Sequence, residues 1–207
     1  MTSLADASGW LLASAGEELD PYGERILEAA HARLLEFGLR KTSLADIASS
    51  AGVSERTLYR RFADRDALLR TLVGREISAL MTRVDNALAG IDDDAERLVT
   101  ACVVFARTLR EHDLLQRLLT TDRDTILPML TTDAGPILTM AQMWIAGAAG
   151  DAELIADRDQ IAELLARVAH SLVLTPTTSL PFQDDEQAAV LARTLFVPLV
   201  TGRRATA

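Results

Sequence analysis

The residues with the clearest capacity for chemistry are clustered in one short segment. Arginine guanidiniums occur side by side at Arg60 and Arg61, and a third, Arg56, precedes Arg60 by one helical turn. The hydroxyl groups of Thr57 and Tyr59 lie between them. Guanidinium and hydroxyl groups donate hydrogen bonds to phosphate oxygens and to acceptors on base edges. A helix face that carries these side chains therefore has the chemistry needed to bind a nucleic acid.

Local start and stop signals place this segment on the second of two short helices. Ser43 and Asp46 have the spacing of a capping box for a helix that begins at Leu44. Ser54 can cap the next helix, which we expect to end near residue 62. Gly52, between the two helices, can adopt the positive φ of a tight turn. Two short helices around a glycine turn are the layout of a helix-turn-helix.

The apolar register supports the same layout. A preceding helix is predicted over residues 22–37, with Gly38 as a left-handed cap, and a long helix is predicted from Asp64 to about Ala89, where Gly90 ends it. The inward residues of the two short helices would pack against the first helix. These predicted core residues are Leu44, Ile47, Ala48, Val53 and Leu58, facing Ile26, Leu34 and Phe37.

Helical patterns continue to the end of the chain, and we find no strand pattern or repeat. Further helices are predicted near residues 94–111, 113–120, 135–149, 157–175 and 184–199, and Pro198 marks the end of the last one. Pro128 interrupts another segment, and a proline-rich loop covers 175–181. Hydrophobic residues make up 49% of the 207 residues but aromatic ones only 4%, so burial depends on aliphatic side chains that favour helices. The predicted fold class is all-α, with about nine helices.

The charge is distributed unevenly. The whole chain has a formal net charge of -9, which by itself argues against a nucleic-acid partner. Between Tyr22 and Arg70, however, nine basic and seven acidic side chains give +2, which leaves -11 for the rest. A weakly basic segment on an acidic body can still approach phosphate, because the body orients it.

Cellular context is inferred from what the sequence lacks. The one cysteine, Cys102, excludes an internal disulfide, and we interpret it as a small buried apolar residue, with redox sensing as the alternative. No charged start of a secretory signal precedes Arg25, and no apolar stretch is long enough to span a bilayer. We therefore expect a cytoplasmic protein with no membrane contact, no metal and no cofactor.

Four motifs of the segment occur in order along the chain. They are TSLADIA at 42–48, AGVS at 51–54, TLYRRF at 57–62 and DRDALL at 64–69. Together they resemble the DNA-binding domain of the TetR family of transcriptional regulators over about 48 residues, from Tyr22 to Leu69. The resemblance implies a homodimer with a three-helix reading head, a ligand-binding body and two dimerising C-terminal helices.

The resemblance also implies a division of the chain. It comprises a flexible N-terminal arm over 1–21, a helix-turn-helix DNA-binding domain over 22–69, a helical ligand-binding and dimerisation domain over 70–202, and a tail over 203–207. Trp10, Leu11 and Leu12 of the arm are candidates for docking on the body.

DNA contacts are predicted at the start of both short helices of the helix-turn-helix and of the long helix that follows them. Further contacts are predicted along the exposed face of the second short helix. Thr57 and Tyr59 match family positions that contact the DNA backbone, and Arg65 stands where the family usually has lysine. At Glu55 and Arg56 the chain departs from the family pattern; Arg56 can bind guanine, while Glu55 can accept from cytosine or hold Arg56. For the adjacent Arg60 and Arg61, a solvated side chain or a salt bridge within the protein is the alternative to a phosphate contact. The predicted set is Thr42, Ser43, Arg56, Thr57, Tyr59, Arg60, Arg61 and Arg65.

Two further sets of residues are predicted in the body, and each has a plainer alternative. Flexible thioethers and a few aromatics suit a cavity for an apolar effector, although the same side chains can simply be core. The strongly amphipathic last helices favour a dimer seam, although they can also close a monomer core. The predicted pocket residues are Met81, Phe105, Leu109, His112, Met140, Met143, Trp144 and Phe182. The predicted seam residues are Ile161, Leu164, Leu165, Val168, Leu172, Leu191 and Leu195.

The sequence favours a ligand-responsive regulator, most simply a repressor, that binds a palindromic double-stranded DNA operator as a homodimer and is released by a small apolar effector. An enzyme built on the helical body is the second hypothesis. The sequence contains no phosphate-binding glycine loop, no His/Asp cluster with metal-ligand spacing and no Ser or Cys in a recognisable catalytic motif that would support it. An architectural DNA binder without sequence preference is the third. It would need a more basic surface than this chain offers.

Overall fold

A computed structural model of the protein describes residues 19–148, 154, 156–175, 180 and 182–201. All regular structure in these ranges is helical, which confirms the predicted all-α class. The described helices form two compact units, one built from residues up to Ser78 with His112–Pro136, the other from Ala79–Glu111 with the residues after Pro136. The predicted arm up to residue 18, with Trp10, Leu11 and Leu12, the tail and most of the proline-rich loop lie outside the described residues.

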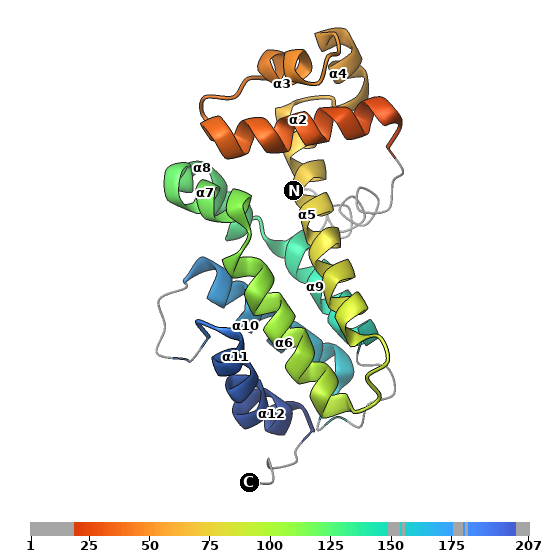
Figure 1. The fold of residues 1–207 in the computed structure, drawn as a ribbon, viewed down its shortest axis with the longest axis vertical. Helices are drawn as coiled ribbons and strands as arrows, with labels where there is room; N and C mark the ends of the chain where they lie inside the picture. The colour runs from red at the N-terminus through yellow and green to blue at the C-terminus, as the bar shows by residue number, and fades with distance from the viewer. Residues whose placement is uncertain (1–18, 149–153, 155, 176–179, 181, 202–207) are drawn as a thin grey trace. The chain divides into compact units, whose positions relative to one another are not determined.

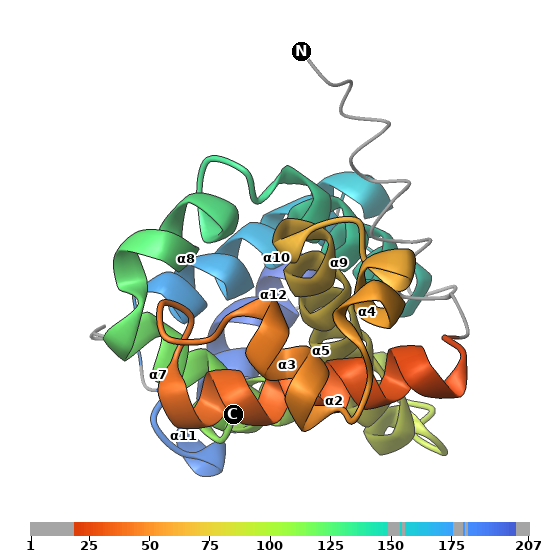
Figure 2. The same cartoon turned by 90° about the horizontal axis from the view of Figure 1, so that it is seen from above.

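The first unit contains the predicted helix-turn-helix. It comprises α2 (Pro21–Phe37), α3 (Leu44–Ser50), α4 (Glu55–Arg61), the first half of α5 (Arg65–Leu88), α7 (Asp113–Thr121) and α8 (Arg123–Leu130). Figures 1 and 2 show α2 running along α3, with α4 at the end of the unit. The side chains that hold these helices together are fully buried. They are Ile26, Leu27, Leu34, Leu58 and Leu68.

The predicted caps are present. Ser43 and Asp46 form the full capping box of α3, and Ser54 accepts a hydrogen bond from the Thr57 N–H at 3.1 Å. Gly52 has φ +63°, which lets the chain turn sharply between α3 and α4. Gly38 has the expected positive φ, +79°, but its ψ of 176° places it outside the left-handed helical region. Only glycine readily adopts that conformation.

One predicted core residue is at the surface. Phe37 is on the edge of α2, where its ring lies 4.2 Å from the Arg33 guanidinium, rather than between the helices. At about 100° per residue, Phe37 projects in the same direction as Ile26 and Leu34, so the helical period alone predicts its burial. The prediction was wrong because Phe37 is the last residue of α2, at the end of the helix, where a cation–π contact takes the place of burial.

The α7–α8 corner belongs to the first unit because a buried carboxylate attaches it. Asp122, between the two helices, accepts hydrogen bonds from the backbone N–H groups of Leu39 at 2.9 Å and Arg40 at 3.2 Å. The compact units therefore differ from the predicted division at residues 69 and 70, since Asp122 is 83 residues from Leu39 in sequence. Pro128, expected to interrupt a helix, lies inside α8, in its last turn.

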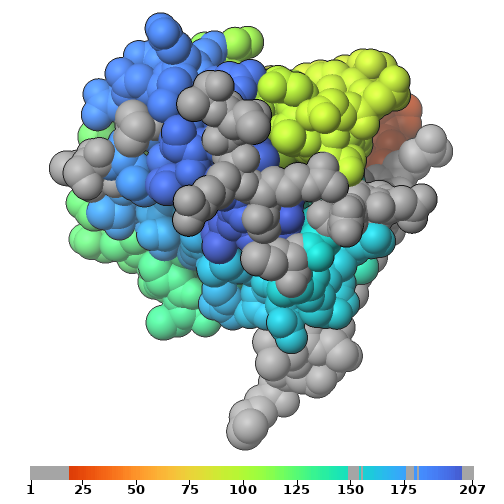
Figure 3. Space-filling model, turned by 90° about the horizontal axis from the view of Figure 1, so that it is seen from below, coloured from red at the N-terminus to blue at the C-terminus, as the bar shows by residue number. Residues whose placement is uncertain are grey.

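The second unit contains the remaining helices. They are the second half of α5, α6 (Asp94–Arg110), α9 (Gly135–Ala148), α10 (Arg158–Leu174), α11 (Asp185–Leu191), η1 (Ala192–Phe196) and α12 (Val197–Thr201). α11 packs along α6, and Arg107 and Arg110 of α6 both donate to the carboxylate of Asp185. Figure 3 views this unit from the end at which α12 and the start of α6 reach the surface.

The last helix does not stop before Pro198 as expected. α11 continues through a single π-helical turn, η1, in which the Val197 N–H bonds to the carbonyl of Ala192, and Pro198 lies within α12. Proline has no N–H and its ring collides with the carbonyl four residues earlier. A wider turn just before the proline accommodates both effects, which explains how the helix continues.

Cys102 on α6 is a free, partly buried cysteine. Burial of the thiol raises its pKa to about 12, so that the thiol stays protonated at neutral pH. This is the environment of an unreactive cysteine. Among the helices of the described residues, none combines the length and apolarity needed to cross a membrane.

Candidate nucleic-acid interface

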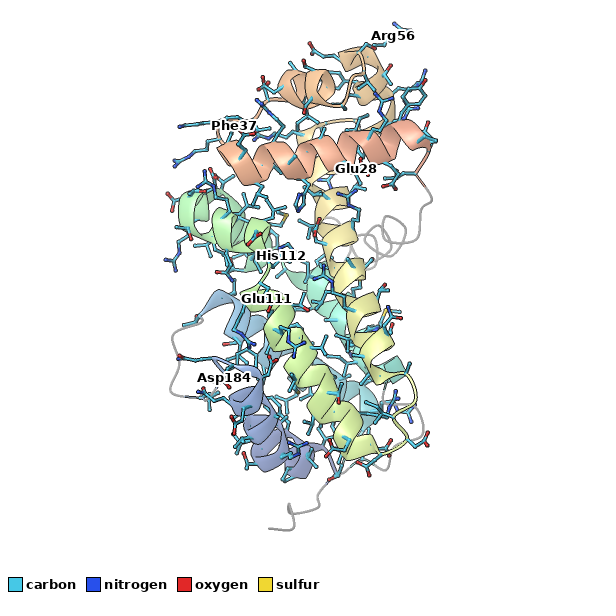
Figure 4. The ribbon with its side chains drawn as sticks, viewed as in Figure 1. Glu28, Phe37, Arg56, Glu111, His112 and Asp184 are labelled. Carbon is cyan, nitrogen blue, oxygen red and sulfur yellow. The ribbon has the colours of Figure 1, made fainter. Side chains whose placement is uncertain are left out.

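α4 presents its polar face to solvent, as the sequence predicts. Leu58 is fully buried, at 0% exposed, and directs this helix onto the core. Tyr59 is 50% exposed, and Arg56 and Arg60 are also exposed. Figure 4 shows the Arg56 side chain at the tip of the unit, pointing away from α2. Three side chains that can donate hydrogen bonds thus share the outer face of one short helix.

Thr57 has a different position on the same helix. Its hydroxyl lies 2.9 Å from the Ser54 hydroxyl, and its N–H donates to the Ser54 oxygen. The side chain is only partly exposed. Thr57 therefore strengthens the cap of α4, and its hydroxyl retains one lone pair and access to solvent at the edge of the face.

Arg61 is engaged within the protein. Its Nε donates to the Asp20 carboxylate at 2.6 Å, a terminal nitrogen donates to the second oxygen of Asp20, and Nη1 donates to the carbonyl of Thr57 at 3.2 Å. The guanidinium also lies over the ring of Tyr22, 4.9 Å from its centroid. As a result the Arg61 side chain is 13% exposed and forms a salt bridge, which is one of the alternatives that the sequence left open.

The N-terminal end of α2 also fixes the helix-turn-helix turn. Arg25 donates to the carbonyl oxygens of Ala51 and Gly52, and its guanidinium lies 5.8 Å from the Tyr22 ring centroid. Sequence reasoning missed the roles of Arg25, Tyr22 and Asp20. The Asp20-Pro21 pair is a recognisable helix start, but pairing across 41 residues leaves no local signal.

The start of α3 supplies a second exposed polar group. Ser43 is exposed, and its hydroxyl and N–H both donate to the Asp46 carboxylate, at 2.6 and 2.9 Å. These hydrogen bonds from Ser43 lower the pKa of Asp46. Thr42 is buried instead, and its hydroxyl donates to the carbonyl of Gly38 at 2.8 Å. The Thr42 side chain therefore stabilises the loop between α2 and α3.

Arg65 is half-buried at the start of α5. Its guanidinium donates to the carbonyl of Leu39 in the loop between α2 and α3. A guanidinium has five N–H donors, so the remaining ones are available to an acceptor outside the protein. Arg65 thus joins the loop to α5 and still presents positive charge at the edge of the unit.

The predicted pocket residues divide between the two units. His112 lies in the first unit, where its Nδ1 accepts from the Leu115 N–H at 3.3 Å, capping α7, and its Nε2 is 3.4 Å from the Glu76 carboxylate. Both ring nitrogens of His112 thus have a partner within the protein, and the hydrogen bond from His112 lowers the pKa of Glu76.

The other predicted pocket residues lie in the second unit. Met140 is buried, Met143 is exposed, and the Trp144 indole donates to the Asp85 carboxylate at 3.2 Å. The remaining ones are partly buried. These are Met81, Phe105, Leu109 and Phe182.

The predicted seam residues include both exposed and buried side chains. Leu164 on α10 and Leu195 in η1 are 44% and 49% exposed, which is unusual for leucine. Ile161 and Leu191 face inward and belong to the core of the unit instead. Leu165, Val168 and Leu172 are partly buried. The sequence analysis missed two more exposed aliphatic residues, Val190 and Leu199.

Comparison with known proteins places this geometry in a family. Residues 26–72 match the family described as "Bacterial regulatory proteins, tetR family", and residues 93–195 match "Bacterial Tetracyclin repressor, C-terminal domain". The HTH-type transcriptional regulator AlkX of Mycobacterium tuberculosis is 29% identical over 175 residues, which cover 82% of this chain and 81% of the relative. An uncharacterized HTH-type regulator of Mycobacterium bovis is 35% identical over 143 residues, covering 65% of this chain and 74% of the relative.

Solved structures show the same fold. The TetR family repressor AlkX from a Dietzia strain, described as implicated in biodegradation of n-alkanes, superposes with a TM-score of 0.66 at 23% identity, over 89% of this chain and 97% of that one. The fatty acid degradation regulator FadR of Bacillus halodurans gives a TM-score of 0.59 at 15% identity, over 92% and 100%. These relatives are regulators rather than enzymes. The exposed polar face of α4, the capped helix-turn-helix and both domain matches agree: the chain belongs to the TetR family of helix-turn-helix transcriptional regulators.

Proposed function

We propose that the protein is a ligand-responsive repressor that binds a palindromic operator as a homodimer. One observation carries the DNA-binding part: Leu58 is buried while Arg56, Tyr59 and Arg60 of the same helix are exposed together. This is the orientation that a recognition helix needs to enter a major groove. The proposed contacts to bases and phosphates come from these three residues, with backbone contacts from Ser43, Thr57 and Arg65. We leave the side chains of Thr42 and Arg61 out of this set because they are engaged internally.

The dimer would form through the last helices of the second unit. Leu164, Val190, Leu195 and Leu199 are large aliphatic side chains exposed on α10 and on the α11–α12 segment. Burying them against a second copy removes apolar surface from water, which is favourable by about 25 cal/mol per Å². A two-fold axis at this seam would present two copies of α4 to successive major grooves, about 34 Å apart.

The effector we propose is a small molecule with an aliphatic chain. α9 contains no charged residue in fourteen positions, and its side chains include Met140 and Met143, which adapt to flexible apolar ligands. The names of two relatives point to the same chemistry, since one repressor is described as implicated in n-alkane biodegradation and one regulator is named for fatty acid degradation. Aromatic residues make up only 4% of this chain, and since aromatic rings are what binds planar cations, this composition fits an aliphatic ligand better than a planar cationic one.

α5 is the proposed transmission element. It is continuous from Arg65, which contacts the loop before α3, to Leu88 in the second unit. An effector that binds better when the spacing of the two reading heads does not match the operator half-sites would shift the population away from the DNA-competent state. A coupling of about 1–3 kcal/mol would weaken operator binding about 5- to 150-fold.

Selection of bound sites from a random duplex library by the purified protein, at physiological salt, tests the operator. The proposal expects an enriched inverted repeat, whose half-sites are one helical turn or a multiple of it apart. A single enriched half-site would overturn the dimeric reader. Equal binding of all sequences would favour an architectural DNA binder instead.

The effector is tested on the complex with the selected operator. A panel of n-alkanes, fatty acids and acyl thioesters is titrated into the complex, with planar aromatic cations as the control set. The proposal expects the aliphatic compounds to raise the melting temperature of the free protein and to release the DNA. Release by the aromatic cations alone would contradict the aliphatic effector while leaving the operator result unaffected.

A further inference from the structure

The strongest unassigned feature of the DNA-binding unit is an ion pair at the edge of the recognition helix. The Asp20 carboxylate accepts two hydrogen bonds from Arg61, and the Thr57 carbonyl accepts a third. All three guanidinium nitrogens of Arg61 therefore donate within the protein. Asp20 itself remains half exposed, so that the pair lies at the surface of the unit rather than in its core.

Aromatic stacking completes the arrangement. The Tyr22 ring lies under the Arg61 guanidinium at 4.9 Å, and Arg25 approaches the same ring at 5.8 Å. Planar guanidinium groups stack on aromatic rings while keeping their in-plane N–H donors, and here those donors point to Asp20 and Thr57. The Arg61 guanidinium is thus held by hydrogen bonds at its edge and by the Tyr22 ring against its face.

The position of Arg61 on α4 explains why the engagement of its guanidinium within the protein matters for DNA binding. With about 100° per residue, Arg61 projects about 60° from the buried Leu58, while Arg60 projects from the opposite side. An arginine at this flank, one turn beyond Thr57, would reach any nearby phosphate if its charge were free. Phosphate contacts raise affinity for all sequences alike.

We propose that Asp20 is a positioning residue that withholds Arg61 from DNA phosphates and so keeps the sequence-independent part of DNA binding low. The proposal rests on the family's DNA binding and not on the identity of the operator or effector. The carboxylate is charged at every physiological pH, because the hydrogen bond from Arg61, with a smaller contribution from the Gly23 N–H, lowers the pKa of Asp20 to about 2.

The substitution Asp20→Asn separates this role from helix capping. Asp20 caps α2 by accepting from the Gly23 N–H at 2.8 Å, and asparagine is as good an N-cap as aspartate. The neutral amide cannot hold the guanidinium as a charge partner. The probe is a random-sequence duplex, with binding measured by fluorescence anisotropy between about 50 and 200 mM salt.

The expected result is stronger binding to the random duplex and a steeper salt dependence. One added phosphate contact changes the slope of log K against log salt by about 0.9, so that the affinity of the variant falls about threefold more than that of the wild type over this fourfold range of salt. A purely structural role would not steepen the slope, because a loosened helix makes fewer phosphate contacts.

Glu24→Gln is the matched control. Glu24 is in the first turn of the same helix and also loses one negative charge, but its partner is Arg75 at 3.6 Å. Arg61→Gln alone should leave the wild-type slope unchanged, and the double variant with Asp20→Asn and Arg61→Gln should return to it. Asp20→Ser, which also retains a capping oxygen, replaces Asp20→Asn if that variant fails to fold.

Three results would overturn the proposal. Glu24→Gln could steepen the slope as much as Asp20→Asn does, which would make the effect one of net charge. The steepening could persist without Arg61, which would assign it to another cation. A slope reduced by about one unit in Arg61→Gln would show that Arg61 already binds a phosphate in the wild-type protein.

Discussion

Neighbouring arginines on α4 lie in different environments because of their direction on the helix. Arg60 lies on the outer face with Arg56, whereas Arg61 lies on the flank that meets α2 and is paired with Asp20. Composition alone gives both the same charge. The local environment decides which charge reaches a ligand, so that the number of basic residues on a recognition helix overstates its capacity to bind phosphate.

Tyr59 is the residue on which the proposed reading face depends most. Tyr59→Ala should weaken operator binding by about 1–3 kcal/mol, because the ring and its hydroxyl are exposed together at the centre of the face. The melting temperature should barely change, since the side chain is not part of the core. The measurement is operator affinity together with thermal unfolding.

Tyr59→Phe serves as its control. If the hydroxyl binds the DNA backbone, the phenylalanine variant should lose part of the affinity, and if the ring presses on a base it should retain most of it. Operator binding unchanged in both variants would show that Tyr59 lies outside the interface.

At the level of single residues, sequence reasoning succeeded where periodicity decides the outcome. The buried Leu58 and exposed Tyr59 follow from the helical repeat, and the capping by Ser43 and Ser54 follows from local spacing. The Asp20–Arg61 pair could not be predicted in this way. Its partners are brought together only when α2 packs across α4, and no periodicity links positions 41 residues apart.

Among the elements, the loop between α2 and α3 is joined by hydrogen bonds to a distant part of the chain. The Asp122 carboxylate accepts from the Leu39 and Arg40 N–H groups and from the Thr121 hydroxyl at 3.0 Å. Gly38 leaves space for this carboxylate, since a Cβ at that position would collide with it. One aspartate therefore links the α7–α8 corner to the loop that leads into the helix-turn-helix.

This link predicts a specific pH dependence of stability. Burial alone would raise the pKa of Asp122, but the hydrogen bonds from Leu39, Thr121 and Arg40 outweigh it and hold the pKa below its ordinary value. A carboxyl whose pKa is lower in the folded state contributes stability above the unfolded pKa, about 3.9, and loses it as the pH falls through the folded value. The wild-type protein should therefore lose stability below about pH 4.

Asp122→Asn tests the contribution directly. The Leu39 and Arg40 N–H groups bond to different oxygens of the carboxylate, so the amide places its NH₂ group where one of these two backbone donors now points. We therefore expect a loss of about 1–3 kcal/mol of unfolding free energy at pH 7. The difference from wild type should shrink as the pH falls below about 4, because only the wild type loses a charge. Urea unfolding at several pH values measures this difference in unfolding free energy.

The exposed Asp124→Asn is the control. A difference between Asp122→Asn and the wild type that stays constant with pH would exclude the charged carboxylate as its source.

Element boundaries were predictable where capping residues mark them, and less so where proline acts late in a helix. α2 to α6 begin and end close to the residues expected from Asp, Ser and Gly signals. Pro198 was expected to end the last helix, but η1 widens the turn before it and α12 follows. Whether a helix stops or adjusts at a proline depends on packing beyond the proline, here on the buried Val200.

For the whole molecule, charge and apolar surface are separated along the chain. The segment from Tyr22 to Arg70 has a net charge of +2, and the remaining residues have -11. Large exposed aliphatic side chains are concentrated on the C-terminal helices, at Leu164, Val190, Leu195 and Leu199. An acidic body discourages contact with DNA except through the basic segment, while its apolar residues offer a surface for self-association.

The proposed dimer can be separated from folding by two substitutions made together. Leu164→Glu with Leu195→Glu places charges on residues that are 44% and 49% exposed, so that each unit should still fold while a seam that buries them is disfavoured. Sedimentation velocity should then show a monomer. Affinity for the full inverted repeat should fall about 10²- to 10⁴-fold towards that for one half-site, since the second head no longer benefits from tethering.

The matched control is Met143→Gln, which makes an equally exposed apolar residue of α9 polar at a position outside the C-terminal helices. It should remain dimeric and retain full operator affinity. A double variant that stays dimeric would move the seam to another surface, because two buried carboxylates without partners could not be accommodated in it. A monomer that still binds the full repeat as tightly as the wild type would instead show that the two heads bind their half-sites independently. The dimer would then not set the spacing between the heads.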